Sequence, residues 1–216
     1  LYLDLVRALG LPTPQAPRPV FRPSPEAQGR AAALLAQAPG PAGAPFLAIH
    51  PGGGVNPGMS LLAKRWPADR FAAVAAILAR EAGARLLLLG GPSDAPVAAA
   101  FRAALPPQAR AGLLDLSGKL DLDQAAACIA GAQLYLGNDS GLAHLATAVG
   151  TPALVLFGPT DPVRYGPLPG TGRALAPAGA DAGHRLAEME GSRAILELSV
   201  ERVARAALAL WAEGAS

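Results

Sequence analysis

The sequence predicts an α/β protein with a Rossmann-like parallel sheet and helices on both of its faces. Apolar runs of five or six residues, such as RLLLLG at 85–90 and PALVLFG at 152–158, alternate with longer segments of helical period. The runs are continuously apolar, as expected of strands that are buried on both faces. Gly and Pro, with 25 and 22 residues, punctuate the connections. This alternation indicates βαβ units.

Five apolar runs are predicted strands, and a sixth segment is a further candidate. The five runs lie at 46–50, 85–89, 112–116, 133–136 and 153–157. The candidate sixth strand is GRALAP at 172–177. Glycine, proline or a short polar cluster follows each of the five runs, so each ends at residues that favour a turn.

Segments of helical period fill the intervals between the strands. They lie at 1–9, 25–37, 67–82, 94–104, 122–131, 140–149 and 200–213. Pro67 suits a first helical position, and Gly83 suits the end of that helix. Ser199 is a predicted N-cap, with Glu201 in the first turn, where the helix dipole favours an acid.

Composition narrows the classes of function. The net charge is only +2, and no Lys/Arg run or aromatic platform occurs, so nucleic acid is not an expected partner. No apolar run approaches the roughly 20 residues that span a bilayer. Cys128, the one cysteine, is predicted to be a packed thiol in a reducing compartment. The chain opens in LYLDLVRALG, without an initiator Met or a signal-peptide pattern, so we expect a fragment, or a chain missing its upstream half. The expected location is the cytoplasm.

Ligands of open parallel sheets bind beyond the carboxyl ends of the strands. The loops at that edge are 50–66, 90–94, 117–121, 137–141 and 158–167. The cluster NDSG at 138–141 precedes a small-residue helix, and two interpretations stay open. It is an ordinary Asx cap, or an anion site where Ser140 and Gly141 let a phosphate approach the helix N-terminus. His144 is either a satisfied or exposed histidine or a ligand-binding one.

Two loops earlier in the chain carry charged candidates. In KRWP at 64–67, Lys64 or Arg65 can reach a phosphate at this edge, or the two form a solvated pair over a packed Trp66. In GGPSD at 90–94, Asp94 accepts from a ribose hydroxyl or is a first-turn acid favoured by the helix dipole.

Other familiar motifs are absent or weak. HPGGG at 50–54 follows a strand, but neither GxGxxG nor GxxxxGK[ST] occurs in the chain. DLD at 121–123 imitates a metal-binding DxD, yet Asp121 is better interpreted as a helix N-cap. The three His residues and one Cys form no cluster at metal-ligand spacing, so no metal is expected.

The order of these motifs resembles the nucleotide-binding half of glycosyltransferase family 9, the lipopolysaccharide heptosyltransferase family. The series is HPG, KRWP, LLGGP, LSGK, GNDSGLAH and TPALVLFGPTDP, with ERVARAALAL as the expected closing helix. NDSGxxH and FGPTDP are its most specific parts. The resemblance implies a GT-B fold, in which two Rossmann-like domains face each other across a cleft. This sequence matches only the carboxyl-terminal, donor-binding domain.

The resemblance also implies a division of the chain and a reaction. Residues 1–44 would be an interdomain crossover helix and Pro-rich linker, 45–198 a Rossmann-like nucleotide-sugar-binding domain, and 199–216 a C-terminal closing helix. The reaction would transfer a sugar from a nucleoside-diphosphate sugar, usually ADP-heptose, to a lipopolysaccharide or other cell-envelope glycan, without a cofactor. The catalytic base and the glycan or lipid-linked acceptor would belong to the missing domain. Peripheral contact with the cytoplasmic membrane is compatible with such an acceptor.

The resemblance assigns roles to individual residues. The donor diphosphate and sugar would be held around the helix N-terminus by Lys64, Asp139, Ser140, Gly141, Leu142 and His144. The nucleoside would face Gly91, Ser93 and Asp94, with Asp94 or Ser93 on the ribose. Further candidates near the cleft are His50, Gly52, Gly53, Thr160 and Asp161.

Two features depart from the family pattern. The loop between HPG and KRWP is longer than usual, and 177–195 lacks the Cys pair that many members carry. Two other interpretations therefore stay open. One is a different GT-B enzyme, a transferase or an epimerase that uses a UDP- or GDP-sugar. The other is a Rossmann-like binding module without catalysis.

Overall fold

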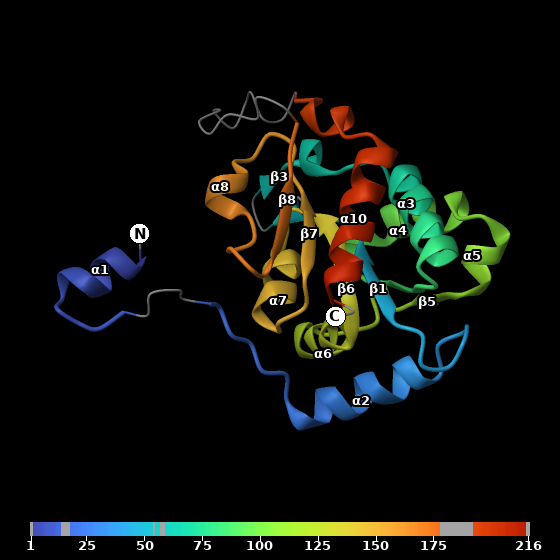
Figure 1. Cartoon of the computed structure of the whole chain (residues 1–216), viewed down its shortest axis with the longest axis horizontal. Helices are drawn as coiled ribbons and strands as arrows, with labels where there is room; N and C mark the ends of the chain where they lie inside the picture. Colours follow the sequence, from blue (N-terminus) through green and yellow to red (C-terminus); the bar gives the residue numbers. More distant parts are fainter. Residues whose placement is uncertain (1, 14–17, 54, 57–58, 178–191, 215–216) are drawn as a thin grey trace.

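The centre of the molecule is a six-stranded parallel sheet in the order β5-β4-β1-β6-β7-β8 (Figure 1). The computed structural model describes residues 2–13, 18–53, 55–56, 59–177 and 192–214. The strands are β1 (Phe46–His50), β4 (Arg85–Leu88), β5 (Leu113–Asp115), β6 (Ala132–Asn138), β7 (Ala153–Leu156) and β8 (Gly172–Leu175). All six predicted strands are confirmed, and the predicted fold class is confirmed with them.

Helices cover both faces of this sheet. One face is covered by α3 (Ala68–Glu81), α4 (Ala95–Ala104) and α10 (Val200–Gly214). The other is covered by α2 (Pro25–Ala36), α6 (Leu122–Ala130) and α7 (Gly141–Ala148). The remaining predicted helix, α1 (Tyr2–Ala8), lies away from the sheet at one end of the molecule (Figure 1). No helix in the described ranges is long and apolar enough to cross a bilayer.

Strand β1 explains why the apolar runs are continuous. Leu47 and Ile49 belong to the core beneath α3 and α10, whereas Phe46 and Ala48 belong to the core beneath α2 and α6. All four side chains are buried. Because successive side chains point to opposite faces, burial on both faces requires an apolar residue at every position.

Helix α2 is tied to the sheet although it follows the Pro-rich linker. The buried Arg85 guanidinium donates to carbonyl oxygens at the end of α2, including that of Pro39 at 3.2 Å, and stacks over the Phe46 ring. At the other end, the Ser24 hydroxyl donates to the Asp123 carboxylate at 2.6 Å. Residues on both sides of position 45 therefore share one core. The predicted three-part division of the chain stays a prediction.

The structure adds short elements that the sequence pattern did not predict. They are α5 (Pro107–Ala111), α8 (Pro162–Tyr165), the 3₁₀ helices η1 (Leu62–Lys64), η2 (Pro92–Asp94) and η3 (Ala194–Glu197), and a hairpin of β2 (Val55–Asn56) and β3 (Met59–Ser60). Each is too short to show an apolar period. The hairpin and η1 lie within the stretch 50–66, which was predicted to be loop throughout.

Strand β6 extends beyond its apolar run. We predicted its end at Leu136, but pairing continues, since His50 pairs with Gly137 and Asn138 with Leu156. The predicted end was early because polar residues inside a central strand interrupt the apolar pattern. Asn138, the first residue of NDSG, therefore lies on the strand.

The Asn138 side chain joins three segments at the carboxyl edge of the sheet. It is fully buried. Its Oδ1 accepts from the backbone N–H of Trp66 at 3.0 Å, and its Nδ2 donates to the carbonyls of Pro51 at 2.9 Å and Gly52 at 3.0 Å. The equally buried Trp66 donates its indole N–H to the Leu198 carbonyl at 2.9 Å. One amide thus fixes the HPGGG and KRWP segments relative to β6.

We expect Asn138→Ala to lower the free energy of unfolding by about 2–4 kcal/mol, because three buried backbone groups lose their partner. Urea denaturation measures this loss. The control is Gln133→Ala on the same strand, which removes one half-buried hydrogen bond to the Trp211 carbonyl and should cost about 1 kcal/mol. Equal losses in the two variants would contradict a special role for Asn138.

Candidate functional site

A pocket of about 730 Å³ opens at the carboxyl edge of the sheet. From β1 the chain winds outward through β4 and β5, and then returns to the other side of β1 as β6. Such a reversal of strand order leaves a crevice above the two central strands. The pocket wall consists of His50, Gly53, Leu61, Lys64, Leu89, Gly90, Gly91, Ser93, Asp94, Leu116, Leu120, Asp121, Leu122, Ala125, Asp139, Ser140, Gly141, Leu142, His144, Thr160 and Tyr165.

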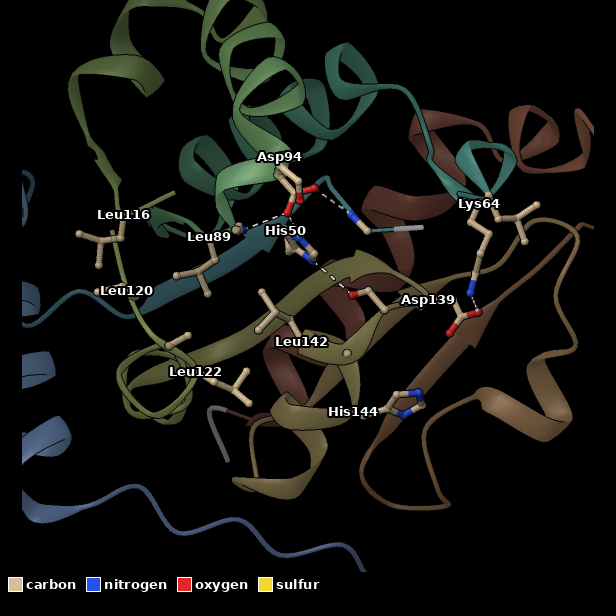
Figure 2. A pocket seen from close by; sticks show the side chains of 18 of the residues that line it. His50, Lys64, Leu89, Asp94, Leu116, Leu120, Leu122, Asp139, Leu142 and His144 are labelled. Atoms are coloured by element: carbon tan, nitrogen blue, oxygen red, sulfur yellow. Dashed lines mark hydrogen bonds and ion pairs between the residues drawn. The ribbon is translucent and has the colours of Figure 1, made fainter. Parts of the chain in front are cut away.

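One end of the pocket is polar. Lys64 Nζ lies 2.5 Å from Asp139 Oδ2, and the Thr160 hydroxyl donates to the same oxygen at 2.8 Å. Only 16% of the Lys64 side chain and 6% of the Asp139 side chain are exposed. Figure 2 shows this pair on the opposite side of the pocket from Leu116 and Leu120, with His144 below it. Partial burial strengthens the attraction of this ammonium for any anion that enters.

The N-terminus of α7 opens into the same pocket. Ser140 is the residue before the helix and has extended backbone angles, but its hydroxyl makes no capping bond. The hydroxyl lies instead 3.2 Å from His50 Nδ1. The interpretation of NDSG as an ordinary side-chain cap is therefore wrong for Ser140. The first N–H groups of a helix have no partner within it, so those of α7 can meet a ligand oxygen.

A buried acid organises the neighbouring wall. Asp94 Oδ1 accepts from Gly53 N–H at 3.2 Å and from the Arg65 guanidinium at 3.3 Å. Its Oδ2 lies 3.0 Å from the Gly91 nitrogen and 3.1 Å from His50 Nε2. Burial by itself raises the pKa of Asp94, but the hydrogen bond and the charge of His50, together with the hydrogen bonds from Gly91 and Gly53, outweigh burial and hold the pKa at about 2. The carboxylate is ionised and already carries four contacts.

Arg65 does not share the role that we considered for it beside Lys64. Its Nε donates to the Gly53 carbonyl at 2.6 Å, and its terminal nitrogen pairs with Asp94. The guanidinium thereby braces the HPGGG loop. Lys64, the other half of the predicted pair, is the lysine that lines the pocket.

Glycines let the HPGGG loop approach this acid. A Cβ on Gly52 would lie 2.2 Å from Asp94 Oδ1. Gly53 has a φ of +99°, and a Cβ there would lie 2.9 Å from the Ser140 Cβ. Any other residue at these two positions would force the loop away from Asp94 and Ser140.

The other end of the pocket is apolar, and the sequence did not predict it. Figure 2 shows Leu89, Leu116, Leu120 and Leu122 together on the side away from Lys64. Leu122 is 61% exposed although it lines the pocket. These residues come from the ends of β4 and β5 and the start of α6. Leu89 and Leu116 end predicted strands, and Leu120 and Leu122 alternate with polar residues at a helix start, so the sequence does not mark them as a pocket wall.

The structure brings most of the predicted site residues into one wall. Those that line the pocket are His50, Gly53, Lys64, Gly91, Ser93, Asp94, Asp139, Ser140, Gly141, Leu142, His144 and Thr160. Two predicted residues do not line it. Gly52 is buried against Asp94, and the Asp161 carboxylate accepts from the Val163 N–H at 2.8 Å as the N-cap of α8. The roles of all these residues in binding stay predictions.

Asp121 is a helix cap. Its carboxylate accepts from the Gln124 N–H at 2.8 Å, and the Gln124 side chain reaches back to the Asp121 N–H, so the N-cap interpretation is confirmed. Within the part of the chain that the structure describes, no three His, Cys, Asp or Glu side chains gather as a metal site requires. The absence of a metal requirement stays a prediction.

Known proteins share this fold and sequence. The family model "Glycosyltransferase family 9 (heptosyltransferase)" matches residues 5–177. Lipooligosaccharide heptosyltransferase 2 of Haemophilus influenzae is 38% identical over 124 residues, which cover 57% of this chain and 34% of that protein.

Two solved structures match nearly the whole chain. The ADP-heptose LPS heptosyltransferase II of Escherichia coli matches with a TM-score of 0.77 and 28% identity, over 97% of this chain and 58% of that one. A family 9 glycosyltransferase from Veillonella parvula matches with a TM-score of 0.82 and 24% identity, over 98% of this chain and 59% of that one, and supports the fold alone.

The chain spans only part of these relatives, about a third of the curated Haemophilus protein and under two thirds of the solved structures. The family model, however, covers most of the chain, including every strand of the sheet. The chain therefore belongs to glycosyltransferase family 9.

Proposed function

We propose that this chain is the donor-binding half of a glycosyltransferase that transfers a sugar from a nucleoside-diphosphate sugar, ADP-heptose, to a lipopolysaccharide or other cell-envelope glycan. The observation that carries the proposal is the two-ended pocket. A half-buried lysine and a helix N-terminus lie at one end, and a group of leucines lies at the other. A nucleotide has the same division, with a charged diphosphate and an apolar base.

The polar end suits the diphosphate. Backbone N–H groups at the start of α7 would donate to its oxygens, and Lys64 would counter its charge. Lys64 is held by Asp139 beforehand, so a phosphate oxygen replaces or joins the carboxylate as its partner. His144, exposed on the first turn of α7, faces the same space. The sugar would lie between Asp139 and His144.

The apolar end suits the base. A planar ring against the leucines removes apolar surface from water on both sides of the contact. The ribose would then lie between the base and the diphosphate, next to η2. Ser93 is exposed and lines the pocket there, whereas the four contacts of Asp94 are already formed. We therefore favour Ser93, supported by Gly91, as the ribose contact.

The chemistry fits these residue types. When the bond between the anomeric carbon and the diphosphate oxygen breaks, negative charge develops on the leaving group. A fixed helix terminus and a lysine stabilise that charge without a cofactor or a metal ion. The acceptor hydroxyl needs a base to take its proton. We assign that base, and the acceptor site, to a further domain outside this chain.

The names of the relatives support a proposal for the cellular setting. Proteins named lipopolysaccharide or lipooligosaccharide heptosyltransferases act on an envelope glycan. We propose that this chain works in the cytoplasm, in peripheral contact with the inner face of the membrane if its acceptor is lipid-linked. A transferase or epimerase for a UDP- or GDP-sugar, and a binding module without catalysis, are the competing proposals.

Nucleotide binding tests the donor site directly. We expect calorimetry to detect ADP with a Kd on the order of 0.1 mM, about −5.5 kcal/mol, and weaker binding of UDP and GDP. No sugar transfer is expected from this chain by itself, because it spans only part of its relatives. A preference for UDP or GDP would favour the competing proposal of a transferase or epimerase that uses a UDP- or GDP-sugar. No binding of any nucleotide would eliminate the donor site.

Lys64→Ala should weaken ADP binding about 10- to 100-fold, as expected from the loss of a charge-assisted contact of about 1.5–3 kcal/mol. Adenosine, which lacks the diphosphate, should bind the variant and the original protein equally. The matched control is Lys119→Ala, which removes a lysine that donates to the Asp115 carbonyl and does not line the pocket. Equal losses for ADP and adenosine would place Lys64 outside the phosphate site.

Leu122→Ser should weaken ADP and adenosine alike by roughly three- to tenfold, because it removes about 1 kcal/mol of apolar contact with the base. The fold should tolerate the change, since Leu122 is 61% exposed. Leu168→Ser, at a 42% exposed leucine outside the pocket, is the control. If Leu122→Ser binds adenosine as tightly as the original protein, the base does not lie against the leucines.

A further inference from the structure

His50 is a buried imidazole with both ring nitrogens engaged. Only 4% of it is exposed, at the end of β1. Nε2 lies 3.1 Å from Asp94 Oδ2, and Nδ1 lies 3.2 Å from the Ser140 hydroxyl, as Figure 2 shows for the Asp94 side of the ring. The ring therefore connects a buried carboxylate with the residue that precedes α7. The proposed sugar transfer assigns no role to His50.

The charge of Asp94 decides which ring nitrogen carries hydrogen. The pKa of Asp94 lies far below neutrality, so the carboxylate can only accept. Nε2 must then be the donor. In a neutral imidazole this leaves Nδ1 with a lone pair, and the Ser140 hydroxyl donates its hydrogen to it.

A second hydroxyl completes the cluster. The Tyr135 hydroxyl, fully buried on β6, lies 3.4 Å from His50 Nδ1. Its ring occupies the space that a side chain on Gly137 would need, since a Cβ there would lie 2.5 Å from the Tyr135 oxygen. Burial raises the pKa of Tyr135, so this hydroxyl keeps its hydrogen at neutral pH. Nδ1 has a single lone pair, which the nearer Ser140 hydroxyl occupies, so the Tyr135 hydroxyl donates to the Ser140 oxygen. The Ser140 hydrogen thereby stays directed inward, away from the pocket.

Protonation of the ring reverses this arrangement. An imidazolium carries hydrogen on both nitrogens. Nδ1–H then donates to the Ser140 oxygen, and the Ser140 hydrogen is free to turn toward the pocket. There it meets a ligand oxygen at the N-terminus of α7, where the partial positive charge of the helix also favours an anion.

We propose that His50 is a positioning residue that takes up a proton when a pyrophosphate binds, so that the Ser140 hydroxyl donates to a phosphate oxygen. The inference rests on the proposed function, because it assumes a pyrophosphate at α7. The proton comes from solvent and ends on Nδ1, and no covalent bond changes. Since the bound state holds one more proton, affinity falls as pH rises, by at most tenfold per pH unit. An unperturbed imidazole changes its charge between about pH 5 and 8.

The other charged or titratable groups near the His50 ring either form ion pairs or lie elsewhere in the pocket wall. Asp94 contacts Nε2 and is itself braced by Arg65 from beyond η1. Lys64 is paired with Asp139. The pocket wall also holds Asp121, which caps α6, and His144 on α7. His144 is the other histidine in the pocket wall, and it therefore serves as the control for His50.

Calorimetry in buffers of different ionisation enthalpy counts the protons taken up on binding. The probe is ADP-ribose, because its pyrophosphate is esterified at both ends and does not titrate near neutrality. For the unchanged chain at pH 7 we expect an uptake of about 0.3–1 proton, with a Kd that rises between pH 6 and 8. His50→Gln keeps a donor for Asp94 but cannot be protonated, and should bind without uptake.

Two further variants separate His50 from its surroundings. His144→Gln, the matched control, should still take up the proton. Ser140→Ala, which leaves the His50–Asp94 pair intact, should reduce the uptake to less than half, since the route from the ring to the phosphate is cut. Thermal melting of each variant verifies that it is folded.

The outcomes distinguish this inference from the proposed function. Binding without uptake, uptake that His144→Gln abolishes, or uptake that Ser140→Ala leaves unchanged would each overturn the role of His50 while the donor site stands. Absence of ADP-ribose and ADP binding would overturn the donor site and this role together.

Discussion

The buried Asn138 amide holds the carboxyl edge of the sheet together, and the site depends on that constraint. Loops between parallel strands have no ladder partners, so their buried backbone groups need a side chain that both donates and accepts. Asn138 provides both at the end of β6, and binds the HPGGG loop and Trp66 at once. His50, Lys64 and the start of α7 are thereby fixed against one another before any ligand enters.

Two aspartates in the pocket wall, Asp94 and Asp139, each pair with a basic side chain, but in different ways. Asp94 is enclosed by Arg65, His50 and two backbone N–H groups, and supports the wall. Asp139 bonds to Thr160 and Lys64 at the open polar end. The first arrangement is saturated and the second can exchange partners, which explains why two aspartates of similar burial suit different tasks.

Most of the fold and the polar end of the pocket could be predicted from the sequence. Short, continuously apolar runs predicted the strands, longer segments of helical period predicted the principal helices, and the order of polar motifs predicted the polar end of the pocket. The apolar end was not predictable, because Leu89, Leu116 and Leu122 look like core residues. The contacts of Asp94 were not predictable either, since they depend on how closely Gly52 packs in space. Nor did the sequence distinguish Ser140 as a cap from Ser140 as a partner of His50.

The ion pair between Lys64 and Asp139 has a consequence for selectivity. An unpaired lysine beside a helix N-terminus would attract any small anion, including inorganic phosphate. Here the Asp139 carboxylate already pairs with this ammonium and neutralises its charge. A ligand that separates this pair must provide an anion that binds Lys64 more strongly than Asp139 does. It must also provide hydrogen-bond donors for Asp139, such as sugar hydroxyls. Under the proposed function, the pair would favour molecules that carry a diphosphate and a sugar together over those that carry either alone.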